Sequence, residues 1–169
     1  MSTLILNSDA SPVSLLPLSI VPWEEAIRYL VSEKATPLEW YDDWVVRSEY
    51  WSTRVPAVMI LKEYQKKKTS IRYSKFNVFL RDGYVCQYCG VDVNRKSATL
   101  DHILPTSHGG KTNWLNTCCS CADCNARKGN NKKIVPKSKP YTPNYFQLAD
   151  KRKKMSWDLQ HPSWADYLG

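Results

Sequence analysis

The chain has 169 residues and a mass of 19.5 kDa, enough for one domain or for a small catalytic module with a second module attached. A content of 43% hydrophobic and 24% charged residues is that of a globular protein and excludes wholesale disorder, a collagen-like repeat and a coiled coil. The longest apolar stretch, 15–23, contains two prolines and is too short to cross a bilayer, so we expect no membrane association. The N-terminus lacks a secretory signal, which predicts a cytoplasmic protein.

Positive charge is concentrated in the middle of the chain. The net charge is +8, but residues 1–61 carry 4 basic and 8 acidic side chains, residues 62–154 carry 20 and 6, and residues 155–169 carry none and 2. A central block of +14 is typical of nucleic-acid binding, because Lys and Arg side chains neutralise phosphates and release counterions. A lysine-rich surface that only confers solubility is the alternative from composition alone.

Residues 1–61 predict a small α+β module. The β-prone run 3–6 predicts a strand, and the segment 22–32 predicts a helix, because its apolar residues recur on one helical face after an acidic first turn. Two further short strands are expected at 38–41 and 57–61, separated by the aromatic segment 44–51.

Beyond residue 61 the expected organisation has three further parts. Residues 62–73 form a basic linker, residues 74–130 a second module, and residues 131–169 a basic strap with a C-terminal helical extension. In the second module, Ser74 is expected to cap a helix over 75–81 that ends at a turn formed by Asp82 and Gly83. Further helical segments are expected at 145–154 and at a terminal turn starting at Pro162, with Trp157 and Trp164 docked back onto the fold.

Four of the six cysteines form two C-x2-C pairs, Cys86 with Cys89 and Cys121 with Cys124. Each pair is followed by a backbone-permissive residue, Gly90 or Asn125, as in a tight knuckle. Four thiolates complete the tetrahedral shell of Zn²⁺ and leave no open position for water. The spacing therefore predicts one structural zinc ion per chain, which joins the two ends of the segment that it encloses.

Cys118 and Cys119 lie outside this spacing. We expect them to be small buried residues, with competition for the metal as the alternative.

Between the knuckles the sequence Thr99-Leu-Asp101-His102-Ile-Leu-Pro105 is strand-like and carries an Asp-His pair that packing does not require. Asn116 follows this run, and Asn125 directly follows the second knuckle, where it begins the sequence Asn125-Ala-Arg127-Lys128-Gly129. Each of these residues alone is weak evidence, but their order together with the knuckle spacing is specific.

These motifs resemble those of the HNH endonucleases, the ββα-metal or His-Me finger nucleases, in the stand-alone bacterial or phage form. The resemblance covers about residues 74–130 and implies an α+β fold, with a ββα-metal HNH core stapled by a four-cysteine zinc site. Residues 1–61 resemble, less specifically, the N-terminal module that accompanies this form. The three signature positions are His102, Asn116 and Asn125, the last being Asn where many members have His.

The resemblance implies a metal-dependent endonuclease that hydrolyses DNA in a bacterial or phage-infected host cell. His102 would be the general base, a task suited to imidazole, and Asn116 would orient its ring by tying the surrounding loop. Asp101 and Asn125 would hold one Mg²⁺ or Mn²⁺ through hard oxygen ligands, with Ni²⁺ or Co²⁺ as further candidates. Adjacent strand residues point to opposite faces, so Asp101 and His102 reach one site only where the strand ends, bends or bulges.

The expected partner is DNA. Basic residues at the end of the second-knuckle helix and nearby are candidates for phosphate contacts: Arg127, Lys128, Lys132, Lys133 and Lys111. One active site cuts one strand, so double-strand cleavage would require a homodimer or two successive events. A catalytically silent zinc-knuckle DNA-binding module and an RNA-directed nuclease are the alternatives to this function.

Overall fold

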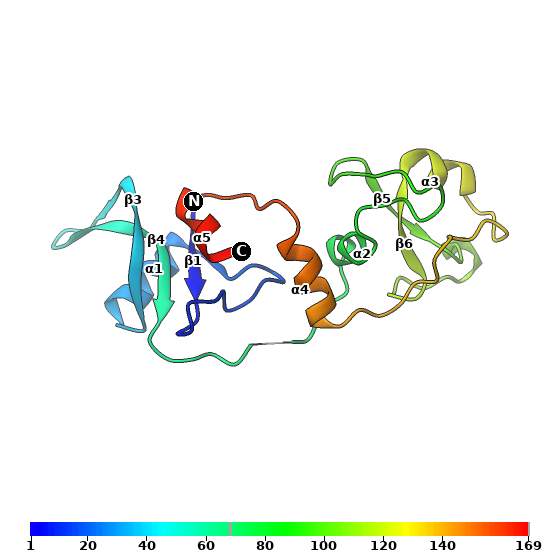
Figure 1. The fold of residues 1–169 in the computed structure, drawn as a ribbon. Helices are drawn as coiled ribbons and strands as arrows, with labels where there is room; N and C mark the ends of the chain where they lie inside the picture. Colours follow the sequence, from blue (N-terminus) through cyan, green and yellow to red (C-terminus); the bar gives the residue numbers. More distant parts are fainter. Residues whose placement is uncertain (68, 169) are drawn as a thin grey trace. The chain divides into compact units, whose positions relative to one another are not determined.

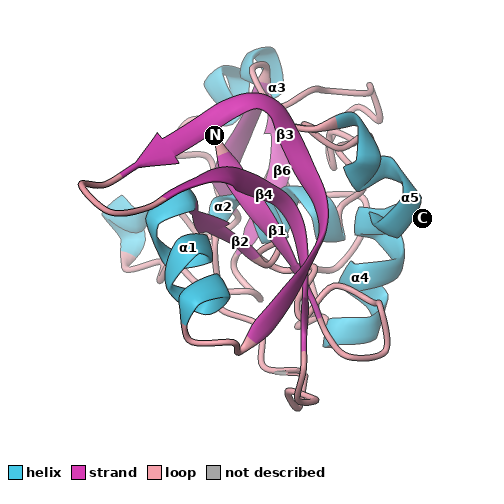
Figure 2. Ribbon diagram, turned by 90° about the vertical axis from the view of Figure 1, so that its left-hand side faces the viewer, coloured by secondary structure: helices cyan, strands magenta, loops and turns pink. Residues whose placement is uncertain are grey.

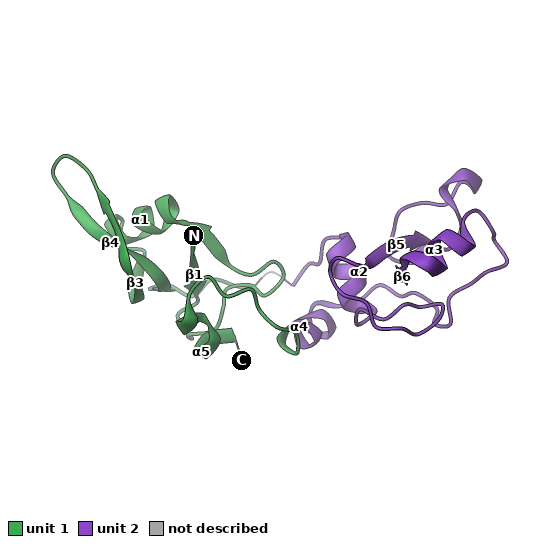
Figure 3. Ribbon diagram, turned by 90° about the horizontal axis from the view of Figure 1, so that it is seen from above, with its two compact units in different colours: residues 1–68, 153–169 green, residues 69–152 purple. Residues whose placement is uncertain are grey.

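The computed structural model describes residues 1–67 and 69–168, which form two compact units (Figure 3). Unit 1 consists of residues 1–68 together with residues 153–169, and unit 2 consists of residues 69–152. The segment 131–169, expected as one extension, is thus divided between the units at residue 152. No helix in the described ranges is long and apolar enough to span a bilayer.

A four-stranded sheet with the order β2-β1-β4-β3 forms the centre of unit 1 (Figure 1). Strand β1 (Ser2–Leu6) pairs antiparallel with β2 (Ile20–Pro22) and parallel with β4 (Ser52–Leu61). Helix α1 (Trp23–Val31) follows β2 directly, with Glu24 and Glu25 in its first turn. Its fully buried residue Ala26 packs in one cluster with Ile5 and Met59, so the predicted amphipathic helix covers part of the sheet.

The other two strands of unit 1 are longer than the sequence pattern predicts. The strands expected at 38–41 and 57–61 are parts of β3 (Ala35–Arg47) and β4, which pair antiparallel as a long curved hairpin (Figure 2). The prediction that the segment 44–51 separates two short strands was wrong, because pairing continues to Arg47 and Ser52. Register shifts between Pro37 and Val45 interrupt the two-residue alternation by which a strand is recognised.

The C-terminal residues complete the core of unit 1. The short helices η2 (Pro162–Trp164) and α5 (Ala165–Leu168) bring Trp164 into the interior, where it is 1% exposed. Its indole Nε1 donates a hydrogen bond of 2.8 Å to the carbonyl of Ala57 in β4. The expected docking of Trp164 onto the fold is therefore made against the central sheet.

Unit 2 contains a ββα arrangement. Strand β5 (Ala98–His102) pairs antiparallel with β6 (Thr117–Cys121), and α3 (Ala122–Lys128) follows β6 without a break. Helix α2 (Lys75–Arg81) contacts both strands and begins as predicted, since the Ser74 side chain accepts a hydrogen bond of 3.1 Å from the Asn77 backbone N–H. The fold of unit 2 is thus the α+β core that the motifs predict.

Arg81 connects three segments of unit 2 from a buried position with 1% exposure. Its guanidinium forms an ion pair with Asp82 at 2.7 Å and donates to the backbone carbonyls of Trp114, Thr117 and Tyr141. Each of these bonds offsets part of the cost of burying the guanidinium charge, and losing one would be unfavourable. Arg81 therefore holds the chain before β6 and the strap after α3 in place.

The basic strap between α3 and α4 (Tyr145–Lys153) forms no helix or strand, as predicted. It is nevertheless attached to the first knuckle. The backbone N–H of Lys137 donates to Gln87 O at 2.7 Å, and the Lys137 ammonium donates to Cys89 O at 2.9 Å. These contacts hold a positive side chain beside the cysteine cluster.

Candidate active site and zinc site

The two knuckles bring four cysteines together. The Sγ atoms of Cys86, Cys89, Cys121 and Cys124 all lie within 4.8 Å of one another, and those of Cys89 and Cys121 are 3.9 Å apart. A tetrahedral zinc ion with bonds of about 2.3 Å places its sulfur ligands about 3.8 Å apart. The donor set and its spacing therefore fit zinc in a closed four-thiolate site.

Backbone groups prepare this cluster for a cation. Although burial of Cys86 opposes ionisation, hydrogen bonds from the backbone N–H groups of Cys89, Cys121 and Tyr88 lower the pKa of its thiol to about 6. Cys121 caps α3 by accepting a hydrogen bond from the Cys124 backbone N–H. These hydrogen bonds favour the metal-binding thiolate form of Cys86, whereas burial first, and then the neighbouring cysteines, raise the pKa of Cys124 to about 12.

Cys118 and Cys119 are not members of this cluster among the described residues. They lie in β6 with exposures of 1% and 0%, and burial raises the pKa of each thiol to about 12. Both are small buried residues, as the sequence predicts.

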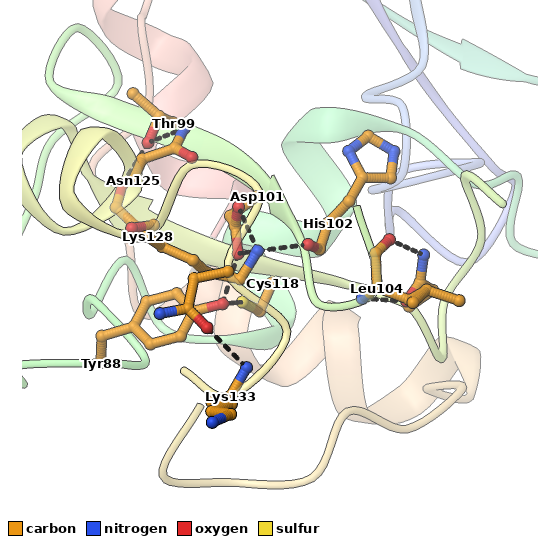
Figure 4. A network of polar contacts seen from close by, with 12 residues as sticks. Tyr88, Thr99, Asp101, His102, Leu104, Cys118, Asn125, Lys128 and Lys133 are labelled. Atoms are coloured by element: carbon orange, nitrogen blue, oxygen red, sulfur yellow. Dashed lines mark hydrogen bonds and ion pairs between the residues drawn. The ribbon is translucent and has the colours of Figure 1, made fainter. Parts of the chain in front are cut away.

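Asp101 is a nearly buried carboxylate close to the end of β5, with 5% exposure. Its Oδ1 and Oδ2 each lie 3.2 Å from the Lys128 ammonium, and Oδ2 also accepts a hydrogen bond from the Tyr88 hydroxyl (Figure 4). The Lys128 ammonium further donates to the His102 carbonyl at 2.6 Å. Burial and then the bond to Asp101 raise the pKa of Tyr88, so its hydroxyl stays protonated as a donor.

Asn125 lies inside α3, and its side-chain Nδ2 donates to Thr99 Oγ1 at 3.2 Å. Thr99 and Asp101 share one face of β5, because side chains alternate along a strand. Asn125 and Lys128 are three residues apart in α3 and therefore lie along this same face. Asn125 is not among the residues with positive φ, unlike Gly90, so the expectation of a backbone-permissive knuckle residue was wrong at Asn125.

His102 ends β5 and projects its ring away from the Asp101–Lys128 pair (Figure 4). The pairing of β5 with β6 stays regular as far as His102 opposite Thr117, so Asp101 and His102 point to opposite faces. The ring Nε2 lies 2.8 Å from Thr112 Oγ1. The structure thus brings Asp101 and Asn125 to one face and holds the imidazole at the end of the same strand.

Asn116 ties together the loop that follows His102. Its Oδ1 accepts from the Leu104 backbone N–H at 2.9 Å, and its Nδ2 donates to the carbonyls of Leu104 and Lys111 at 3.1 and 2.9 Å. Its backbone carbonyl accepts from the Ile103 N–H at 2.9 Å. The loop leading from His102 to Thr112 is therefore fixed at both ends by one side chain.

Four of the basic residues expected to contact phosphate are exposed: Arg127, Lys132, Lys133 and Lys111. Arg127 also donates to Cys124 Sγ at 3.4 Å. Lys128 departs from the expectation, because its side chain is buried and its ammonium is engaged by Asp101 and the His102 carbonyl. The assignment of Lys128 to a phosphate-contacting surface was therefore wrong.

Three residues at the site were not found by sequence reasoning. Tyr88 lies inside the first knuckle, and its hydroxyl, as a hydrogen-bond donor between two cysteines, was the only feature of the sequence that could have drawn attention to it. Thr112 contacts the His102 ring. Arg81 holds the chain before β6. The last two are recognisable only once the strands are paired.

Two family models match successive parts of the chain. Residues 3–69 match an HNH endonuclease-associated N-terminal domain, and residues 86–135 match an HNH endonuclease domain. The second match contains both knuckles and the residues of the β5–α3 face. Comparison with curated proteins gives no match.

Proposed function

Because this chain belongs to the HNH endonuclease family, we propose that it hydrolyses phosphodiester bonds in DNA with His102 as the general base. The observation that carries the proposal is the arrangement around β5. Asp101 and Asn125 lie on one face, His102 is the last residue of β5, where the strand ends, and Asn116 ties the following loop. A metal-dependent nuclease requires a proton acceptor, oxygen ligands for a cation and a group that orients the acceptor, and these residues would supply them.

His102 supplies the proton acceptor in this proposal. When Nε2 donates to Thr112 Oγ1, the unprotonated Nδ1 can take a proton from a water molecule. That water then attacks phosphorus, its oxygen forms the new P–O bond, and the bond to the departing 3′ oxygen breaks. Asn116 contributes by fixing the loop that carries Thr112, which in turn orients the ring.

Asp101 and Asn125 would hold Mg²⁺ or Mn²⁺ through carboxylate and amide oxygens, which are hard donors. The donor set fits a hard cation, because the Asp101 carboxylate lies on the same face of β5 as Thr99, which Asn125 of α3 contacts. The bond from Asn125 Nδ2 to Thr99 uses the amide nitrogen and leaves Oδ1 for a ligand role. When bound, the ion would stabilise the negative charge that develops on the phosphate and leaving oxygens.

The four-cysteine cluster would hold zinc for stability and take no part in the reaction, because four thiolates close the coordination shell. Arg127, Lys132, Lys133 and Lys111 would contact DNA phosphates, which position the duplex without reading its sequence. One such site per chain cuts one strand, so a double-strand break would take two copies or two events.

Cleavage of supercoiled plasmid with Mg²⁺ or Mn²⁺, with and without EDTA, tests this function. We expect metal-dependent relaxation that His102→Ala lowers by about a hundredfold to ten-thousandfold, since a general base contributes about that factor. DNA affinity of the same variant should stay within about twofold of wild type and fall steeply with salt. His108→Ala, at an exposed histidine, is the matched control.

Three other results of these experiments would contradict the proposal. DNA binding without cleavage in any divalent metal would favour the silent zinc-knuckle module. Preferential cleavage of RNA of the same sequence would favour an RNA-directed nuclease. Full activity of His102→Ala would remove the assigned base.

A further inference from the structure

Tyr88 belongs to the first zinc knuckle but reaches into the candidate active site. It lies between Cys86 and Cys89 in the sequence, in the spacer that joins the two cysteines of this knuckle. Its hydroxyl donates to Asp101 Oδ2 (Figure 4). A single residue of the first knuckle therefore contacts the carboxylate proposed to bind the divalent cation.

From this geometry we infer that Tyr88 is a positioning residue through which the zinc knuckle orients the Asp101 carboxylate for the catalytic cation. The inference rests on the proposed function only in taking Asp101 as a ligand of that cation. Neither the nuclease domain match nor the cysteine spacing assigns any role to Tyr88.

The carboxylate is fixed from two sides. The Lys128 ammonium contacts both oxygens from α3, and the Tyr88 hydroxyl approaches Oδ2 from the knuckle. The Cys118 thiol lies opposite Asp101 in the β5–β6 pair and donates to the Tyr88 hydroxyl at 3.8 Å. The phenol is thus held between β6 and β5, with its own proton directed at Asp101.

The knuckle holds the Tyr88 backbone in turn. The Gln87 N–H donates to the Cys119 carbonyl at 2.9 Å, which attaches the spacer between the two cysteines to β6. Binding of Cys86 and Cys89 to one metal ion would fix both ends of this spacer, and Tyr88 lies inside it. Residues that hydrogen-bond a metal ligand typically change metal affinity or activity 10–100-fold when removed.

Tyr88→Phe removes the hydroxyl and keeps the ring. We expect this variant to retain one zinc per chain and to bind Mn²⁺ about tenfold or more weakly, measured without DNA by electron paramagnetic resonance of free Mn²⁺. The Mn²⁺ concentration that gives half-maximal plasmid cleavage should rise by the same factor, with the rate recovering at saturating Mn²⁺. Tyr84→Phe, which removes the hydroxyl of another buried tyrosine in the same unit, should leave all three quantities unchanged.

Two results would overturn the inference. Wild-type Mn²⁺ affinity in Tyr88→Phe would show that the hydroxyl does not position Asp101. A cleavage rate that stays low at saturating Mn²⁺ with unchanged Mn²⁺ affinity would assign Tyr88 a different role. Should the wild-type protein bind Mn²⁺ in a Tyr88-dependent manner without cleaving nucleic acid, the proposed function would fail and the inference would stand.

A second measurement does not depend on the stability of Tyr88→Phe. With 3-fluorotyrosine placed at position 88 alone, the ¹⁹F resonance of the full-length zinc-loaded protein should shift on addition of Mg²⁺. The shift should be absent in Asp101→Asn. No response to Mg²⁺ in the otherwise wild-type protein would contradict the inference.

Discussion

At the residue scale, Asn125 is the position where the amide replaces the histidine of the family name. Asn125→Ala should abolish cleavage in Mg²⁺ and be rescued at most partly by high Mn²⁺, because it removes a hard oxygen donor. Asn125→His should keep activity and shift metal preference toward Mn²⁺, Co²⁺ or Ni²⁺, since imidazole favours softer metals. Plasmid cleavage across a metal series measures both outcomes.

The bond from Asn125 to Thr99 supplies a control for this prediction. Thr99→Val removes the partner of Nδ2 and leaves the amide oxygen in place, so it should weaken cleavage far less than Asn125→Ala. Asn125→Gly with full activity in Mg²⁺ would remove the ligand role. The alternative in which Asn125 caps a knuckle with left-handed backbone already fails, because Asn125 lies within α3.

The Asp101–Lys128 pair leads to a stability prediction. The side chains are 6% and 0% exposed, so Lys128→Met leaves a buried carboxylate without its cation and should cost unit 2 about 3–5 kcal/mol. Urea unfolding measures this loss, and Lys96→Met, at an exposed lysine, is the control. Mg²⁺ should stabilise Lys128→Met more than wild type, because a divalent cation at Asp101 restores the missing charge. Equal stability of the two variants would contradict the assignment.

Sequence spacing led to the proposal of Asp101, His102, Asn116 and Asn125 as site residues, because their order along the chain is part of the motif. It could not identify Tyr88 or Thr112, whose partners depend on how β5 pairs and where the loop returns. Lys128 was misassigned for the same reason. A lysine beside other basic residues is expected at the surface, and its burial becomes evident only from the packing of α3 against β5.

At the scale of elements, the cysteine cluster joins the turn after α2 to the start of α3. Cys124→Ser should lose the zinc and unfold unit 2, since a structural zinc site contributes about 10 kcal/mol or more of apparent binding free energy. Metal analysis should give about one zinc per wild-type chain after mild chelation that removes Mg²⁺. Cys118→Ala, outside the cluster, should retain the zinc. A folded, zinc-free wild-type protein would contradict the prediction.

Helices were predicted better than strands. Helix α2 has a capping serine and a short apolar face, and both signals are local. Strand β6, with the sequence TCCSC, is buried on both faces and shows no alternation, so it was missed. Strand β2 has three residues next to a helix start, and the irregular register of β3 hides its length.

At the scale of the whole molecule, unit 1 is assembled from both ends of the described chain, and unit 2 is inserted between them. Trp164→Ala should destabilise unit 1 by about 3–5 kcal/mol, because it removes a fully buried aromatic ring. Trp164→Phe should cost about 1 kcal/mol through the lost hydrogen bond to Ala57. Limited proteolysis and zinc content should show unit 2 intact in both variants. Loss of zinc from Trp164→Ala would contradict the independence of the units.

This organisation could not be derived from the sequence. Trp164 and Ala57 are separated by 107 residues, and no periodicity records so distant a contact. The charge distribution gave a partial indication of the two units, because the acidic segments 1–61 and 155–169 flank the basic block.

The insertion sets an order of events on the ribosome. Synthesis proceeds from the N-terminus, so β1 to β4 leave the ribosome first. Their sheet lacks Trp164 for as long as residues 69–152 are being synthesised. The knuckles and the β5–α3 face can therefore close before the sheet of unit 1 receives its last core residue. In a nascent chain arrested after residue 152, unit 2 would be complete while the core of unit 1 still lacked Trp164.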